Sequence, residues 1–285
     1  MLRTNKDKLP IVSVQGQVWQ GRAKPGGALT YDGKAVWLVS TGGITYNAKI
    51  GDICVGWAAD HLEPGVSTKN SNEDENVVYQ TRSCVGNVAE VRSGDAKGAK
   101  GIVTGKHGGA EHLMIYFDQE TLEKLDIGDK ILVRAVGQGM ELLDHPEILL
   151  RNLSPDLLEK MNITEAGGKL KIGVAKIVPA EIMGSGLGSR GVSTGDYDIT
   201  LFDEEITKKH GLDTLRFGDI VAIINADNRY GRQYKTGAVS IGVVIHGDCV
   251  MAGHGPGVTT LMTCKTPLIE AFIDPKANLA DFFIK

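Results

Sequence analysis

The sequence has few cysteines, and their spacing excludes two common kinds of small stabilised domain. Cys54, Cys84, Cys249 and Cys264 are scattered, and no two of them form a C-x-x-C pair. A zinc ribbon or a disulfide framework would need closer and more regular spacing. We therefore expect reduced thiols, as in the cytoplasm, and we expect Cys249 to be a buried core thiol.

The sequence also lacks the features of nucleic-acid-binding and membrane proteins. The formal net charge is −4, and Lys and Arg are not clustered as a phosphate-binding surface requires. No apolar run approaches the roughly 18 residues of a membrane span. The opening residues, MLRTNKDKLP, lack the apolar segment of a signal peptide. These absences predict a cytoplasmic protein that binds a small molecule, and neither nucleic acid nor a membrane.

What the sequence does contain is enough apolar residues for a sizeable β-rich core. The chain has 285 residues, 42% of them hydrophobic, which suits one large domain or two smaller ones. Short β-branched segments alternate with glycine-containing turns. We predict an α+β fold that is predominantly β, with two barrel-like or sandwich-like β modules and short connecting helices. The expected modules are residues 1–150 and 151–285.

One turn pattern recurs at the expected entrance to strands. It is an apolar residue followed by Gly-Asp, and it occurs at Gly51-Asp52, Gly128-Asp129 and Gly218-Asp219. Glycine supplies the turn conformation, and the aspartate can accept a backbone hydrogen bond. The strands expected after these turns are 53–57, 130–136 and 220–225. The unequal spacing excludes a solenoid repeat and favours barrel-like modules.

Three other segments have simpler expected structures. Residues 67–76 are rich in Ser, Asn, Asp and Glu and predict an exposed loop. Residues 267–273 are compatible with a last helix. The apolar tail from Leu279 to Ile284 must pack somewhere, either on its own chain or on another subunit.

The densest cluster of reactive side chains lies between residues 237 and 263. The β-branched run from Val239 to Met251 predicts a buried strand. On such a strand His246 and Asp248 would leave the same face. An imidazole beside a carboxylate suits a divalent metal ion or an acid–base pair.

The glycine-rich segment Gly253–Gly257 follows that predicted strand and carries His254. Its glycines allow φ > 0 and close backbone approach. The loop could therefore hold His254 at the mouth of a site and direct the N–H groups of Gly255 and Gly257 at an anion. We predict His246, Asp248 and His254 as metal ligands or catalytic residues. A buried core histidine and an ordinary glycine turn is the alternative.

Two segments of the first half offer partners for these histidines. Asp60-His61 ends a predicted strand and gives two further candidate catalytic residues. If the chain is extended there, the two side chains point to opposite faces unless it turns. Lys106-His107 could bind a carboxylate or phosphate of a substrate, although the P-loop spacing is missing.

A further glycine-rich segment runs from Gly184 to Arg190. It lacks the G-x-G-x-x-G spacing of a dinucleotide site, so a flap or anion-holding loop with Arg190 contacting substrate is the better interpretation. Asp196 and Asp198 follow at same-face spacing. With His246 or His254 they would suit a divalent metal, but exposed aspartates on a strand edge explain them more simply. No G-x-S-x-G motif supports a serine nucleophile.

Several phrases resemble a known but uncharacterised family. They are GWAADHLEPGVS, GKHGGAEH, IMGSGLGSRGVSTGDYDI, LRFGDIVAI and GVVIHGDCVMAGHGPGV. They are similar to bacterial and archaeal proteins catalogued as a domain of unknown function and known from structural-genomics work. The resemblance spans nearly the whole chain. It implies an N-terminal and a C-terminal portion and brings no activity, substrate or cofactor.

A second similarity is to acetamidase/formamidase amidohydrolases, through Ser240-Ile241-Gly242 followed by His246-Gly247-Asp248. The order and spacing depart from the Ser-x-Gly-Asp-x-His phrase of that family. The leading hypothesis is a hydrolase-like enzyme for a small polar molecule, with or without a divalent metal ion, whose site lies between the modules. The alternatives are a non-catalytic binder of an anionic metabolite and a structural homo-oligomer.

Overall fold

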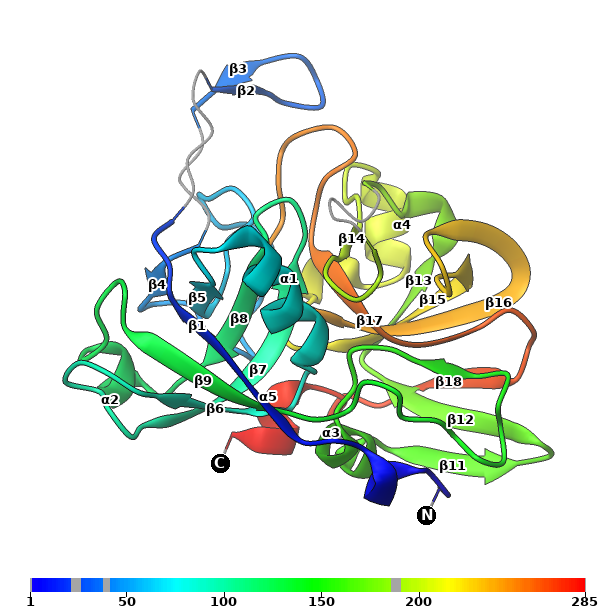
Figure 1. Ribbon diagram of the computed structural model, residues 1–285. Coiled ribbons are helices and arrows are strands. Elements are labelled where there is room, and N and C mark those ends of the chain that lie inside the picture. The colour runs from blue at the N-terminus through cyan, green and yellow to red at the C-terminus, as the bar shows by residue number, and fades with distance from the viewer. Residues whose placement is uncertain (1, 22–26, 38–41, 186–190, 285) are drawn as a thin grey trace.

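The structure is a computed structural model that describes residues 2–21, 27–37, 42–185 and 191–284. It is dominated by β-strands arranged as two modules, with short helices at their edges (Figure 1). The predicted α+β, predominantly β fold is confirmed. No helix in these ranges is both long and apolar enough to cross a membrane.

Six antiparallel strands of the first half close into a barrel. Their order is β1 (Val12–Val18), β9 (Lys130–Ala135), β6 (Val88–Val91), β7 (Lys100–His107), β8 (His112–Tyr116) and β5 (Gly65–Lys69). The barrel closes where β5 pairs with β1 at Gln17↔Lys69 and Val18↔Thr68. β4 (Ile44–Thr45) extends β5, and the helices of this half are α1 (Glu73–Arg82) and α2 (Gln119–Leu122). Inward-facing apolar residues such as Val103 and Ile131 fill the barrel.

The second half contains two sheets. The larger has the order β10 (Leu149–Leu150), β17 (Gly257–Cys264), β16 (Gln233–Val244), β15 (Ile220–Asp227) and β13 (Lys176–Pro179), and β14 (Tyr197–Asp198) also pairs with β17. The smaller consists of β11 (Ile163–Ala166), β12 (Lys169–Val174) and β18 (Ile269–Ile273). The helices are α3 (Pro155–Lys160), α4 (Glu204–Lys209) and α5 (Leu279–Phe283), with 3-10 turns at Ala180–Ile182 and Leu212–Thr214. A further 3-10 turn, Lys6–Lys8, precedes β1 in the first half.

The two modules meet where β7 crosses β17. The backbone N–H of Lys106 donates to Thr259 Oγ1 at 3.1 Å, and that hydroxyl lies 3.2 Å from the Lys106 carbonyl oxygen. At the adjoining β7 position, Gly105 leaves no space for a Cβ because the Ile245 side chain fills it. This close contact brings the end of β7, with His107, against the segment that follows β16.

A small hairpin of β2 (Ala28–Leu29) and β3 (Ala35–Val36) projects from the body (Figure 1). Its tip is held to the second half, because Tyr31 stacks on Phe202 with ring centroids 4.2 Å apart. The Tyr31 N–H also donates to the Val250 carbonyl at 2.8 Å. The hairpin therefore contacts the loop that carries His254.

The three Gly-Asp turns are confirmed in atomic detail. Each glycine has a positive φ, and each aspartate accepts from the backbone N–H three residues earlier, at Lys49, Asp126 and Arg216, over 2.9–3.0 Å. Strands follow the second and third turns. The strand predicted over 53–57 is wrong, because only Ile53 forms a bridge there, to Arg216.

Two other local predictions are also wrong. Residues 67–76 are not an exposed loop but contain the end of β5 and the start of α1, which is capped by the Asn72 side chain. Residues 269–273 form β18 and not a helix, because they pair in parallel with β12. The apolar tail forms α5 on its own chain, where Leu279 is buried and Phe283 packs against the core.

Candidate functional site

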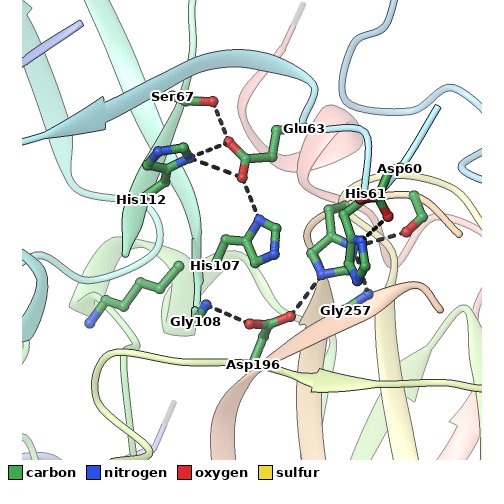
Figure 2. Close-up of polar contacts among 12 residues, drawn as sticks. Asp60, His61, Glu63, Ser67, His107, Gly108, His112, Asp196 and Gly257 are labelled. Carbon is green, nitrogen blue, oxygen red and sulfur yellow. Dashed lines mark hydrogen bonds and ion pairs between the residues drawn. The ribbon is translucent and has the colours of Figure 1, made fainter. Parts of the chain in front are cut away.

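Four histidines from distant parts of the chain lie together. His61 and His107 come from the first half, and His246 and His254 from the segment between β16 and β17. The ring centroids of His107 and His246 are 4.3 Å apart, and those of His61 lie 4.9 Å from His246 and 5.1 Å from His254. The structure thus joins the imidazoles of both halves at the module boundary (Figure 2).

His61 reaches this position because the backbone turns sharply there. Its φ is +49°, in the left-handed region that a non-glycine residue adopts only at some energetic cost. The turn places Asp60 beside the ring, with Oδ1 2.5 Å from His61 Nδ1. Asp60 and His61 therefore both belong to the site, which an extended chain would have prevented.

The other ring nitrogen of His61, Nε2, faces His254 and Asp198. His61 Nε2 lies 3.1 Å from His254 Nδ1 and 3.6 Å from Asp198 Oδ2. Asp198 Oδ2 is 3.2 Å from His254 Nδ1, and its Oδ1 is 3.9 Å from His246 Nε2. His254 is about one-third exposed and the other members are buried. Solvent therefore reaches the cluster from the side of His254.

Asp196 and Asp198 are buried at the centre of the site. The interpretation as exposed strand-edge aspartates is wrong, because β14 pairs with β17 and turns both carboxylates toward the histidines. Asp196 Oδ2 lies 2.9 Å from His246 Nε2, and its Oδ1 accepts from the Gly108 N–H at 2.7 Å. Their same-face spacing was the signal in the sequence.

The electrostatics of the cluster favour charged pairs. Burial lowers the pKa of His61, but hydrogen bonds with Asp198 and Asp60 outweigh it and raise that pKa to about 12. Burial also lowers the pKa of His246, and Asp196 more than offsets this. Conversely, burial raises the pKa of Asp198, while His254 and His61 bring it below its usual range. The lowered pKa of Asp198 favours its ionised form, which attracts positive charge to this point.

A buried carboxylate supports His107 from behind (Figure 2). Glu63 Oε1 contacts His107 Nδ1, and both Glu63 oxygens lie within 3.1 Å of His112 Nδ1. The Ser67 hydroxyl also donates to Glu63. Burial raises the pKa of Glu63, but the two histidines lower it well below its usual value. Glu63 and His112 were not predicted from the sequence. The β7–β8 hairpin makes His112 the cross-strand partner of His107.

Lys106 lies beside His107 in sequence, but its side chain is directed elsewhere. The buried Nζ donates to Asn152 Oδ1 and to the Ser193 carbonyl, both at 2.7 Å. Burial lowers the pKa of this amine to about 8. The lysine therefore ties β7 to the second module. Arg190, the other cation predicted to contact substrate, lies outside the described residues.

Asp248 and Cys249 are placed differently from a continuous strand, because β16 ends at Val244. The Asp248 carboxylate accepts from the Gly56 N–H at 2.9 Å. It belongs neither to the group formed by His61, Asp198 and His246 nor to the group formed by Asp60, His61 and Cys249. The Cys249 thiol lies 3.1 Å from Asp60 Oδ1, beside His61 and not in an apolar core. Burial raises the pKa of Cys249, which does not suit an activated thiol nucleophile.

The two glycines predicted to bind an anion have mainly steric roles. The Gly255 N–H donates to Asp198 Oδ2 at 3.2 Å, and the Ile199 carbonyl occupies the space where its Cβ would lie. At Gly257 a Cβ would collide with the His246 ring and Asp196. These positions let the loop pack directly onto the site.

Several of these side chains lie close enough together that they could hold a cation. His61, Asp198 and His246 each offer an atom within 4.8 Å of the others, and so do Asp60, His61 and Cys249. The separations of His61 Nε2, His254 Nδ1 and Asp198 Oδ2, 3.1, 3.2 and 3.6 Å, bracket the value of about 3.3 Å between ligands on tetrahedral zinc with bonds of about 2.0–2.1 Å. His61, His254 and Asp198 are therefore spaced so that they could hold a divalent ion.

Comparison with known proteins gives the family. Residues 28–159 match the N-terminal domain of unknown function DUF4438, and residues 160–283 match its C-terminal domain. The chain belongs to the DUF4438 family. The crystal structure of TM1086 is similar to this DUF4438 protein with 45% identity and a TM-score of 0.92, covering 99% of each chain. No curated protein matches significantly, and the similarity to amidohydrolases finds no support in these matches.

Proposed function

We propose that this DUF4438 protein is a metal-assisted hydrolase of a small polar molecule, with its site at the boundary of the two modules. The observation that carries the proposal is the approach of His61 Nε2, His254 Nδ1 and Asp198 Oδ2 to within 3.1–3.6 Å of one another. Imidazole nitrogen and carboxylate oxygen together suit zinc and similar ions.

The chain's own residues divide into three roles in this proposal. His61, His246, His254 and Asp198 hold the cation. Asp196 Oδ2 lies 2.9 Å from His246 Nε2, the nitrogen that also faces Asp198, so it fixes the ring in the metal-free protein and would lie beside the cation once that nitrogen binds it. Glu63 holds His107 through Nδ1, and Figure 2 shows the second ring nitrogen of His107 directed toward the cluster. His107 is thus placed to hydrogen-bond a polar substrate.

A divalent ion would supply Lewis acidity, polarising a carbonyl or phosphoryl oxygen and making a bound water more acidic. The protein residues orient and enclose the substrate. His254, as the most exposed ligand, lies at the entrance, while buried His246 and Asp198 exclude bulk water from the far side.

Elemental analysis of the purified protein tests the proposal. We expect at least one equivalent of a divalent metal per chain, lost in His246→Ala and His254→Ala. His210→Ala is the matched control, because His210 caps α4 outside the cluster. Hydrolysis of a panel of small esters, amides and phosphoesters should fall at least 100-fold in the two ligand variants. Full metal content in those variants would show that His246 and His254 are not metal ligands.

The alternative of an anion binder has weaker support. The N–H groups of Gly108 and Gly255 donate to Asp196 and Asp198 of the same chain, so these donors are already used. The carboxylates at the centre also repel an anion unless a cation is present. A homo-oligomer is a separate prediction, which a measurement of the mass of the assembly in solution would test.

A further inference from the structure

His61 stands between two sets of ligand atoms, one at each ring nitrogen. Nε2 faces His254 and Asp198, as described above. Nδ1 faces Asp60 Oδ1 at 2.5 Å, and Cys249 Sγ lies 3.1 Å from the same oxygen. The atoms offered by Asp60, His61 and Cys249 all lie within 4.8 Å of one another.

We propose that this second set is a separate cation site containing a thiolate ligand, and that the His61 ring bridges it to the first. The inference rests on the proposed function for its first cation. It extends that function to a pair of ions, one bound by nitrogen and oxygen and the other by nitrogen, oxygen and sulfur. The sulfur selects a thiophilic ion such as zinc or cobalt over magnesium or calcium.

The charge of the buried groups is consistent with two divalent ions. With both sites filled, Asp60, Asp198, the Cys249 thiolate and the deprotonated His61 ring carry four negative charges, which two divalent cations neutralise. The protons of the thiol and of the ring pass to solvent. Each ion would therefore lie beside a carboxylate of its own, Asp198 at the Nε2 side of the His61 ring and Asp60 at the Nδ1 side.

The backbone is arranged so that one ring can serve both sets. His61 has a φ of +49°, and strained conformations of this kind cluster at functional sites. The three ligands of the second set come from two segments that are held together locally, because the His61 N–H donates to the Asp248 carbonyl at 3.3 Å. That hydrogen bond fixes the Cys249 segment against Asp60-His61.

Titration of metal-free full-length protein with cobalt(II) tests the inference through absorption. We expect two equivalents per chain, and a sulfur-to-cobalt charge-transfer band that develops during one of the two steps. Cys249→Ser should lose that band and one equivalent while keeping the other. Asp198→Asn should weaken the first site and keep the band. Cys264→Ser, which changes another buried cysteine, should behave like the native protein.

The outcomes separate this inference from the proposed function. One equivalent with no charge-transfer band in the native protein overturns the thiolate site and leaves the first cation intact. No cobalt binding at all overturns both. Two equivalents with a band that survives in Cys249→Ser also overturns the assignment. The native titration decides the first two cases even if a variant folds poorly.

Discussion

The Lys106 amine donates to Asn152 Oδ1 at 2.7 Å inside the protein. Asn152 itself has a φ of +47°, and its amide donates to the Val192 and Thr260 carbonyls. One buried cation therefore connects the barrel strand β7 with three segments of the second half. It also makes stability depend on pH in the direction opposite to that of a lysine whose pKa is raised by a carboxylate partner.

Stability should rise with pH because of Lys106. Burial lowers its folded-state pKa to about 8 from 10.5, so between these values the unfolded chain binds the proton and the folded chain does not. The penalty for burying the charge is complete below pH 8 and is relieved toward pH 10.5. Between pH 7 and pH 10, the unfolding free energy of the native protein should gain about 2–3 kcal/mol relative to Lys106→Met. Urea unfolding at both pH values measures this, and a constant difference would refute the assignment.

Gly257→Ala should damage the site with little effect on the rest of the fold. The added Cβ would collide with the His246 ring and Asp196, and misplacing such supporting contacts typically weakens metal affinity by about 10–100-fold. Competition with a chromogenic chelator measures the affinity. Gly191→Ala is the matched control, because a Cβ there meets no atom within 4 Å. Equal affinity in both variants contradicts the geometry.

Glu63→Gln should destabilise the protein strongly. The change leaves His107 and His112 beside a neutral amide in place of the buried carboxylate that both contact. Breaking a buried pair by removing one charge costs about 3–5 kcal/mol, and we expect a loss of that order in urea unfolding. Glu123→Gln, an exposed change at the end of α2, should alter stability by less than about 0.5 kcal/mol. A loss below 1 kcal/mol for Glu63→Gln would show that the network is not ionised.

Deleting residues 279–285 should lower stability without changing the size of the assembly. Leu279 is 2% exposed, and the tail packs on the core of its own chain. Removing a buried leucine side chain alone costs about 2–5 kcal/mol, so the melting temperature should fall by several degrees or more. Light scattering gives the mass of native and shortened protein. A fall in mass would make the tail a subunit contact, and the exposed substitution Asp281→Asn is the control.

The sequence predicted which residues form the site better than it predicted their arrangement. Residue types and glycine density singled out His61, His107, His246 and His254, and the structure brings all four together. The two-residue periodicity used for His246 and Asp248 applies only inside a strand. Because β16 ends at Val244, that argument had no basis beyond it.

What the sequence could not supply was contact between distant segments. Asp196 and Asp198 are buried only because β14 pairs with β17, and Glu63 matters only because the β7–β8 hairpin presents two histidines to it. The same holds for β18, a short apolar segment that becomes a strand through its parallel partner β12. Local turn chemistry needed no such information, and the Gly-Asp turns were predicted correctly.

The position of His61 early in the chain also affects when the histidine cluster can form during synthesis. His61 leaves the ribosome well before Asp198, His246 and His254, so the nascent barrel carries only part of the ligand cluster. In the proposed function, the complete ligand set would form only after the segment between β16 and β17 has emerged and docked. The contacts of the His61 ring with His254 and Asp198 can therefore form only when both halves have folded against each other.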